Sequence, residues 1–131
     1  MKDNLYTILL VDDNFDNLEL LEEILQARGY RTLKAQTGFD ALRLAASEQP
    51  NLILLDIAIP VMDGMEVLQV LKSDRVTAHI PVMFVTGIME NEKIFRAIEN
   101  HLAVDYVIKP IVISEFLDKI SSYLSKIRKK L

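Results

Sequence analysis

The sequence predicts an α/β protein with a doubly wound parallel sheet of five strands in the order 2-1-3-4-5, alternating with five helices. Short apolar runs alternate with longer amphipathic stretches along the whole chain. Such strict alternation implies right-handed crossovers and helices on both faces of a parallel sheet. Three of the runs are continuously apolar, as in strands buried on both faces. The other two mix polar and apolar residues, which suits the two edges of this strand order.

The five strands are expected, in chain order, at residues 8–11, 30–35, 52–55, 82–85 and 104–108. The runs at 30–35 and 104–108 are the mixed ones and are assigned to the edges. The segments between the strands carry apolar residues at helical spacing, and most begin with a residue that can cap a first turn. The capping candidates are Asp13 or Asn14, Thr37, Asp63 and Ser114. The pattern of the fourth helix, around 94–98, is weaker.

Composition places the chain among globular proteins. Its 131 residues fit one domain with a real core, and 50% are hydrophobic and 26% charged. The net charge of -4 argues against general nucleic-acid binding, and the absence of cysteine excludes disulfides and thiolate chemistry. No signal-peptide pattern opens the chain, and no apolar run approaches the roughly 18 residues that span a membrane. These features fit a cytoplasmic protein.

Polar residues follow four of the five predicted strands. Ligands of such sheets bind beyond the carboxyl ends of the strands, and these four strands are neighbours in the predicted order. Their ends should therefore converge at one edge of the sheet. The residues there are Asp12 and Asp13, Asp56, Thr86 and Gly87, and Lys109 and Pro110.

Three carboxylates gathered at one edge repel one another unless a cation lies between them. Oxygen ligands without histidine or cysteine suit a hard ion such as Mg²⁺. Lys109 adds one fixed positive charge, so the edge could receive a phosphoryl group. A carboxylate aligned with that group could attack phosphorus and form an acyl phosphate.

Four segments carry a resemblance to a known family. They are ILLVDDN (8–14), LILLDIAIPVMDG (52–64), PVMFVTG (81–87) and VDYVIKP (104–110). With this order and spacing the chain resembles the receiver domain of response regulators, a CheY-like, flavodoxin-like fold. The resemblance covers about residues 5–124. It implies a receiver domain over 1–124, followed at 125–131 by a basic extension of the last helix.

The resemblance implies roles for the acidic residues. Asp56 matches the phospho-accepting nucleophile of the family. Asp13 is similar to the residue that ligates Mg²⁺ directly, and Asp12 to the one that assists directly or through water. The backbone carbonyl of Ala58, two residues after the acceptor, resembles a further metal ligand.

The resemblance also implies a group of phosphoryl-binding and switch residues. Lys109 matches the lysine that pairs first with the acceptor and then with the phosphoryl oxygen, and its bond to Pro110 is expected to be cis. Thr86 matches the hydroxyl that turns toward the phosphoryl group, and Gly87 leaves room for that group. Tyr106 stands at the place of the family's switch aromatic.

The function implied by the resemblance is that of a signalling switch. A histidine kinase or a His phosphotransfer protein would transfer a phosphoryl group to Asp56 with Mg²⁺ present. The change would reach the surface of helix 4, strand 5 and helix 5, and control a downstream protein or an output domain missing from this chain. Slow self-hydrolysis is expected, so we classify the protein as a switch and not an enzyme. A homodimer is left open; direct nucleic-acid or membrane binding is not expected.

Particular residues bear on other classes of protein. A receiver-like scaffold that works without phosphorylation is the main alternative. A haloacid-dehalogenase-type phosphatase needs a second aspartate two residues after the nucleophile, where this chain has Ala58. A flavodoxin-type carrier needs a Ser/Thr/Gly-rich loop in place of the acidic segment after the first strand. Leu102, where the family commonly has glycine, predicts a different turn into the last strand.

Overall fold

Five parallel strands form one sheet in the order β2-β1-β3-β4-β5, as predicted. The computed structural model describes residues 6–87 and 92–129. The first residues of the chain, where no signal peptide was expected, and the last two of the expected basic extension lie outside these ranges. The strands are β1 (Thr7–Val11), β2 (Arg31–Ala35), β3 (Leu52–Leu55), β4 (Val82–Thr86) and β5 (Asp105–Ile108).

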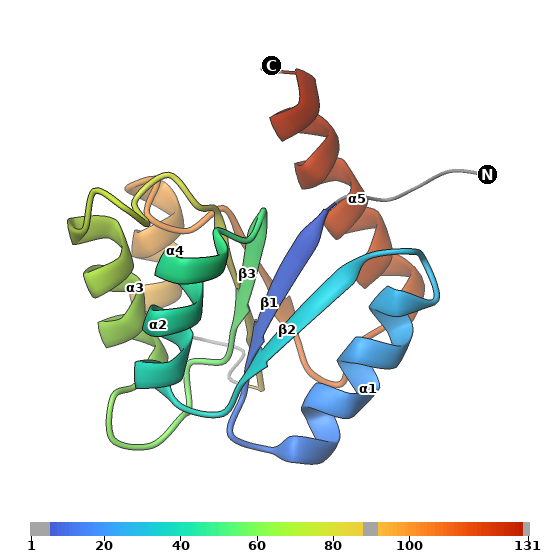
Figure 1. Cartoon of the computed structure of the whole chain (residues 1–131), viewed down its shortest axis with the longest axis horizontal. Coiled ribbons are helices and arrows are strands. Elements are labelled where there is room, and N and C mark those ends of the chain that lie inside the picture. Colours follow the sequence, from blue (N-terminus) through green and yellow to red (C-terminus); the bar gives the residue numbers. More distant parts are fainter. Residues whose placement is uncertain (1–5, 88–91, 130–131) are drawn as a thin grey trace.

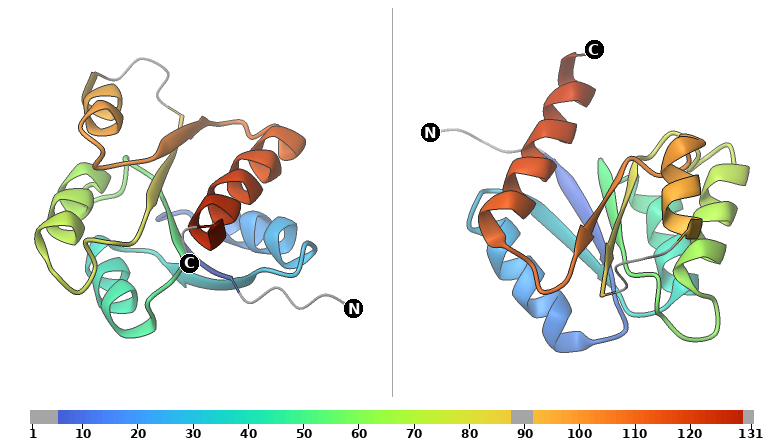
Figure 2. Two further views of the ribbon diagram at one scale, coloured as in Figure 1. Left: turned by 90° about the horizontal axis from the view of Figure 1, so that it is seen from above. Right: turned by 180° about the vertical axis from the view of Figure 1, so that it is seen from behind.

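Five helices alternate with the strands and cover both faces of the sheet. Figures 1 and 2 show α1 and α5 on one face, and α2, α3 and α4 on the other. The last turns of α5 extend beyond the edge at which the strands begin (Figure 1). In the part of the chain described, no helix combines the length and apolar content needed to cross a membrane. The helices are α1 (Phe15–Gln26), α2 (Gly38–Glu48), α3 (Gly64–Ser73), α4 (Glu92–Glu99) and α5 (Ile113–Lys129).

The sheet separates two hydrophobic cores because neighbouring side chains of a strand point to opposite faces. On β1, Ile8 and Leu10 pack with residues of α1 and α5, whereas Leu9 and Val11 pack with residues of α2, α3 and α4. All four side chains are buried, as are those of the other two continuous apolar runs. This explains why the runs at 8–11, 52–55 and 82–85 contain no polar residue before the carboxyl ends of these strands.

Most helix starts follow the predicted caps. Asn14 caps α1, Thr37 caps α2, and Asp63 caps α3, where Glu66 completes a capping box. The prediction that Ser114 caps the last helix is wrong. That helix begins at Ile113, so Ser114 lies inside its first turn.

The turn into β5 is formed by a left-handed residue next to Leu102. His101 has φ 62°, and the backbone N–H groups of Leu102 and Ala103 both donate to the carbonyl of Ala97, at 2.8 and 3.1 Å. Histidine is one of the residues that adopt this backbone region more often than most. The turn is therefore closed without a glycine at position 102.

Candidate functional site

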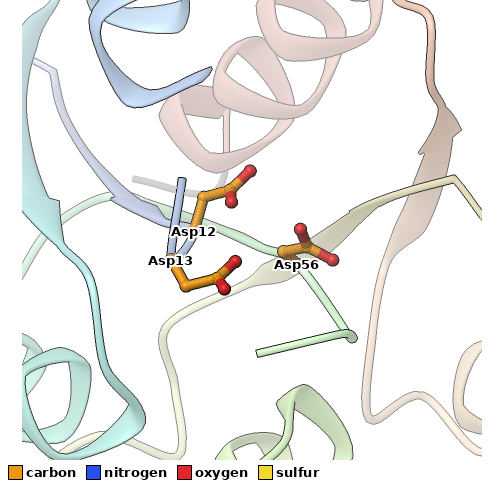
Figure 3. A group of neighbouring side chains, drawn as sticks. All are labelled: Asp12, Asp13 and Asp56. Atoms are coloured by element: carbon orange, nitrogen blue, oxygen red, sulfur yellow. The ribbon is translucent and has the colours of Figure 1, made fainter. Parts of the chain in front are cut away.

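The acidic residues predicted from the strand ends lie together. Carboxylate oxygens of Asp12, Asp13 and Asp56 lie within 4.8 Å of one another, with two residues from the end of β1 and one from the end of β3 (Figure 3). The backbone N–H of Asp12 donates to Ala35 of β2, and that of Asp56 donates to Val11 of β1. The sheet's hydrogen bonds thus continue through both residues and fix their backbones.

Lys109 provides the positive charge that two buried carboxylates require. Asp12 and Asp56 are only 3% and 6% exposed. The Lys109 ammonium donates to Asp12 Oδ2 at 3.0 Å and to Asp56 Oδ2 at 2.9 Å. Its own backbone N–H donates to the carbonyl of Thr86, and its peptide bond to Pro110 is cis. The lysine therefore bridges β5 to the ends of β1 and β3.

Burial alone would lower the pKa of the Lys109 ammonium, because it disfavours the charged form. Hydrogen bonds to Asp56 and Asp12, together with the attraction between the charges, outweigh burial and raise the pKa above its ordinary value of 10.5. Lys109 is therefore positively charged throughout the neutral range.

The remaining carboxylate oxygens differ in their partners. Asp12 Oδ1 accepts from the backbone N–H of Asn14, and Asp56 Oδ1 accepts from that of Ala58, both at 2.9 Å. Asp13 is exposed, and among the described residues no donor reaches its carboxylate. With all three carboxylates ionised, one ammonium leaves an excess of negative charge. This oxygen-only donor set fits a divalent cation such as Mg²⁺.

The other predicted switch residues lie on β4, directly after it, and on β5. Thr86 is the last residue of β4 and fully buried, so it belongs to the strand and not to the loop after it. Gly87 is exposed, and a Cβ built there meets no described atom within 4 Å. The Tyr106 ring lies edge-on to Phe95, with centroids 5.6 Å apart, and Lys119 Nζ lies 5.1 Å from its centre.

Two contacts at the site were not predicted. Gly64, at the start of α3, packs directly against the backbone of Asp56: a Cβ there would lie 2.5 Å from the carbonyl oxygen of Asp56. Asn17 in α1 donates its side-chain amide to Asp12 Oδ2 at 3.3 Å. Asn17 stands in the helix turn that directly follows the two aspartates, which places it near them, but the sequence does not show that its amide reaches Asp12.

Comparison with known proteins identifies the family. The family model described as "Response regulator receiver domain" matches residues 8–121. The "Polar-differentiation response regulator DivK" of Brucella ovis is 37% identical over 119 residues, which cover 90% of this chain and 95% of that protein.

Two similar solved structures point to the same family. A response regulator receiver domain protein (CheY-like) from Methanospirillum hungatei is 31% identical, with a TM-score of 0.88 over 98% of this chain and 100% of that one. The N-terminal domain of a response regulator receiver protein from Methanoculleus marisnigri is 32% identical, with a TM-score of 0.76 over 91% and 96%. The protein belongs to the response regulator receiver domain family and is a CheY-like signalling protein.

Proposed function

We propose that Asp56 accepts a phosphoryl group from a phosphohistidine of a histidine kinase or a His phosphotransfer protein. The observation that carries this proposal is the shared ammonium of Lys109, hydrogen-bonded to both Asp56 and Asp12 inside a cluster of three carboxylates. A purely structural ion pair would need only one of these carboxylates. The surplus of negative charge at a strand end instead suits a site that also receives a cation.

In the proposed transfer, an oxygen of Asp56 attacks phosphorus. A phosphorus–oxygen bond forms, the phosphorus–nitrogen bond of the phosphohistidine breaks, and the imidazole leaves with the electron pair and takes up a proton. The strand end fixes the Asp56 backbone, and the N–H of Ala58 holds Oδ1 at 2.9 Å, so the carboxylate is oriented before the donor arrives. Lys109 then supplies positive charge to the transferred oxygens.

The acidic triad is of the kind typical of the Mg²⁺ site in receiver domains. We assign the metal ligands to Asp13, Asp56 and the backbone carbonyl of Ala58, with Asp12 assisting. When bound, Mg²⁺ would offset the negative charge of the carboxylates and of the incoming phosphoryl group. The exposed carboxylate of Asp13 supports this assignment, because it is accessible and has no competing donor among the described residues.

The signal would pass from the acceptor to the surface of α4, β5 and α5. Thr86 is expected to turn toward the phosphoryl group and Gly87 to admit it, while Tyr106 changes its position. The contacts of Tyr106 with Phe95 of α4 and Lys119 of α5 support this route, because a moving ring would disturb both helices. The altered surface would then control a downstream protein or an output domain.

The test is phosphorylation by a small donor. Wild-type protein is incubated with acetyl phosphate and Mg²⁺, and intact-protein mass spectrometry is expected to show the gain of one phosphoryl group. Asp56→Asn should abolish the gain, since an amide is a poor nucleophile. Asp118→Asn is a matched control on the exposed surface of α5 and should retain it. If no Mg²⁺-dependent adduct forms with this donor or with a phosphohistidine protein, the phosphorylation-independent scaffold becomes the better reading.

A further inference from the structure

Asp12 and Asp13 are neighbours in sequence, but among residues 6–87 and 92–129 donors hold only the carboxylate of Asp12. Its Oδ1 accepts from the backbone N–H of Asn14 at 2.9 Å. Its Oδ2 accepts from Lys109 Nζ at 3.0 Å and from the amide of Asn17 at 3.3 Å. Asp12 is also buried, whereas Asp13 is exposed. The two carboxylates are therefore prepared for different tasks.

Asn17 reaches Asp12 from a rigid position. Its backbone N–H donates to the side chain of Asn14, the cap of α1, at 3.0 Å. Its side chain is half-buried and, together with Lys109, lines a hollow of about 280 Å³ between α1 and the segment after β5. The cap thus fixes the first turn of α1, and this turn holds the Asn17 amide next to Asp12.

The position of Asp12 matters because Lys109 has a long and flexible side chain. Its ammonium stays between Asp12 and Asp56 only while both acceptors keep their oxygens turned toward it. Asp56 is held on its other oxygen by Ala58. Asp12 is held on one oxygen by Asn14 and on the other by Asn17. Removing the Asn17 amide would leave Oδ2 with the mobile lysine as its remaining partner.

We propose that Asn17 is a positioning residue for phosphoryl transfer to Asp56. Its amide keeps Asp12 Oδ2 turned toward Lys109, so that Asp12 anchors the lysine, while Asp13, Asp56 and the carbonyl of Ala58 are the direct ligands of the metal that Asp12 assists. After transfer, Asp56 carries the phosphoryl group, and Asp12 remains the fixed partner of the ammonium. This inference rests on the function proposed above.

Asn17→Ala tests the inference without removing the helix cap, because alanine retains the backbone N–H that donates to Asn14. The rate of phosphorylation by acetyl phosphate at saturating Mg²⁺ should fall about tenfold, the factor expected for one lost hydrogen bond to an ionised group. The Kd for Mg²⁺, titrated without donor and followed by backbone amide NMR shifts, should stay within about twofold, since Asn17 is not a ligand.

Gln26→Ala is the matched control. It removes an exposed hydrogen bond of 3.0 Å from the side-chain amide of Gln26, in the same helix, to the hydroxyl of Thr32. The phosphorylation rate and the Kd for Mg²⁺ should both stay unchanged. A second readout is hydrogen exchange of the Lys109 ammonium protons, observed by NMR without metal or donor. Exchange should be faster in Asn17→Ala than in the wild type, because Asp12 no longer holds the ammonium as firmly.

Two outcomes would overturn the inference. If Asn17→Ala had the same phosphorylation rate and the same exchange rate of the Lys109 ammonium protons as the wild type, Asp12 would not need the Asn17 amide to hold its position. A parallel tenfold loss of Mg²⁺ affinity would show that Asn17 supports the whole acidic site and not the Asp12–Lys109 pair. Failure of the proposed function is distinguishable from both, since the wild-type protein itself would then take up no phosphoryl group.

Discussion

Replacing Gly64 by alanine tests how closely the start of α3 is packed against the backbone of Asp56. The added Cβ would lie 2.5 Å from the carbonyl oxygen of Asp56 and 2.6 Å from Cα of Ile57. Ordinary contacts of a Cβ begin at 3.4 Å, so the two segments must separate by about 0.9 Å. Both obstacles are backbone atoms, which cannot rotate away as a side chain can. A hydrogen bond of 2.9 Å from the Gly64 N–H to the carbonyl of Ile57 also opposes the separation.

We expect Gly64→Ala to lower the free energy of unfolding by about 1–3 kcal/mol, the usual cost of forcing extra volume into a packed site. Urea unfolding measures this value. The phosphorylation rate should fall further than stability alone explains, because the displacement falls on Asp56 itself, and a shift of about 1 Å in a reacting group can cost on the order of a hundredfold.

The other described glycines that are not in the left-handed region provide graded controls. At Gly38 the nearest atom is a side-chain methyl of Val67 at 2.8 Å, and the nearest backbone atom, the carbonyl oxygen of Met62, is 3.1 Å away, so Gly38→Ala should cost less than Gly64→Ala. At Gly87 no described atom lies within 4 Å, so Gly87→Ala should leave the free energy of unfolding unchanged. Equal stability of Gly64→Ala and wild type, or a larger loss in Gly87→Ala, would refute the packing argument.

Two further predictions concern the charges of the site. Asp13→Asn should raise the free energy of unfolding in EDTA by about 1 kcal/mol, because it removes one of three repelling carboxylates. At saturating Mg²⁺ this gain should disappear, because the bound ion stabilises the wild type, which keeps Asp13 as a ligand, more than the variant. If Asp13→Asn were less stable than wild type in EDTA, the argument from carboxylate repulsion would be contradicted. For Lys109 the pKa is raised above 10.5, so its stabilising effect is complete below that pH and is lost as pH rises through the folded-state pKa. Urea unfolding from about pH 9 to 12 should therefore show the stability of wild type falling toward that of Lys109→Ala; a constant difference would count against the ion pairs.

The strand order and the convergence of Asp12, Asp13, Asp56 and Lys109 were predictable because each depends on regular features. Strands covered on both faces exclude polar residues, so the first carboxylate marks the strand end. Parallel strands then bring their carboxyl ends to one edge. The sequence pattern and the topology therefore determine which residues meet, without knowledge of any side-chain conformation.

Other features depend on individual contacts and could not be predicted this way. The last helix begins at Ile113 with a backbone bond from Phe116 to the carbonyl of Val112, so the capping pattern at Ser114 was misleading. The amide of Asn17 reaches Asp12 only because of its rotamer and the direction of α1. Gly64 is required by an approach of two backbones that leaves no periodic signal.

The edge strands of the sheet limit how copies of this protein can associate. Strands β2 and β5 have only five and four residues, and β2 exposes the charged side chains of Arg31 and Lys34. Short edge strands, and the charged side chains on β2, disfavour the addition of another strand, which can lead to sheet-based aggregation. Continuous sheets across molecules are therefore disfavoured, and any contact between copies of this protein is expected to use helix surfaces instead of sheet edges.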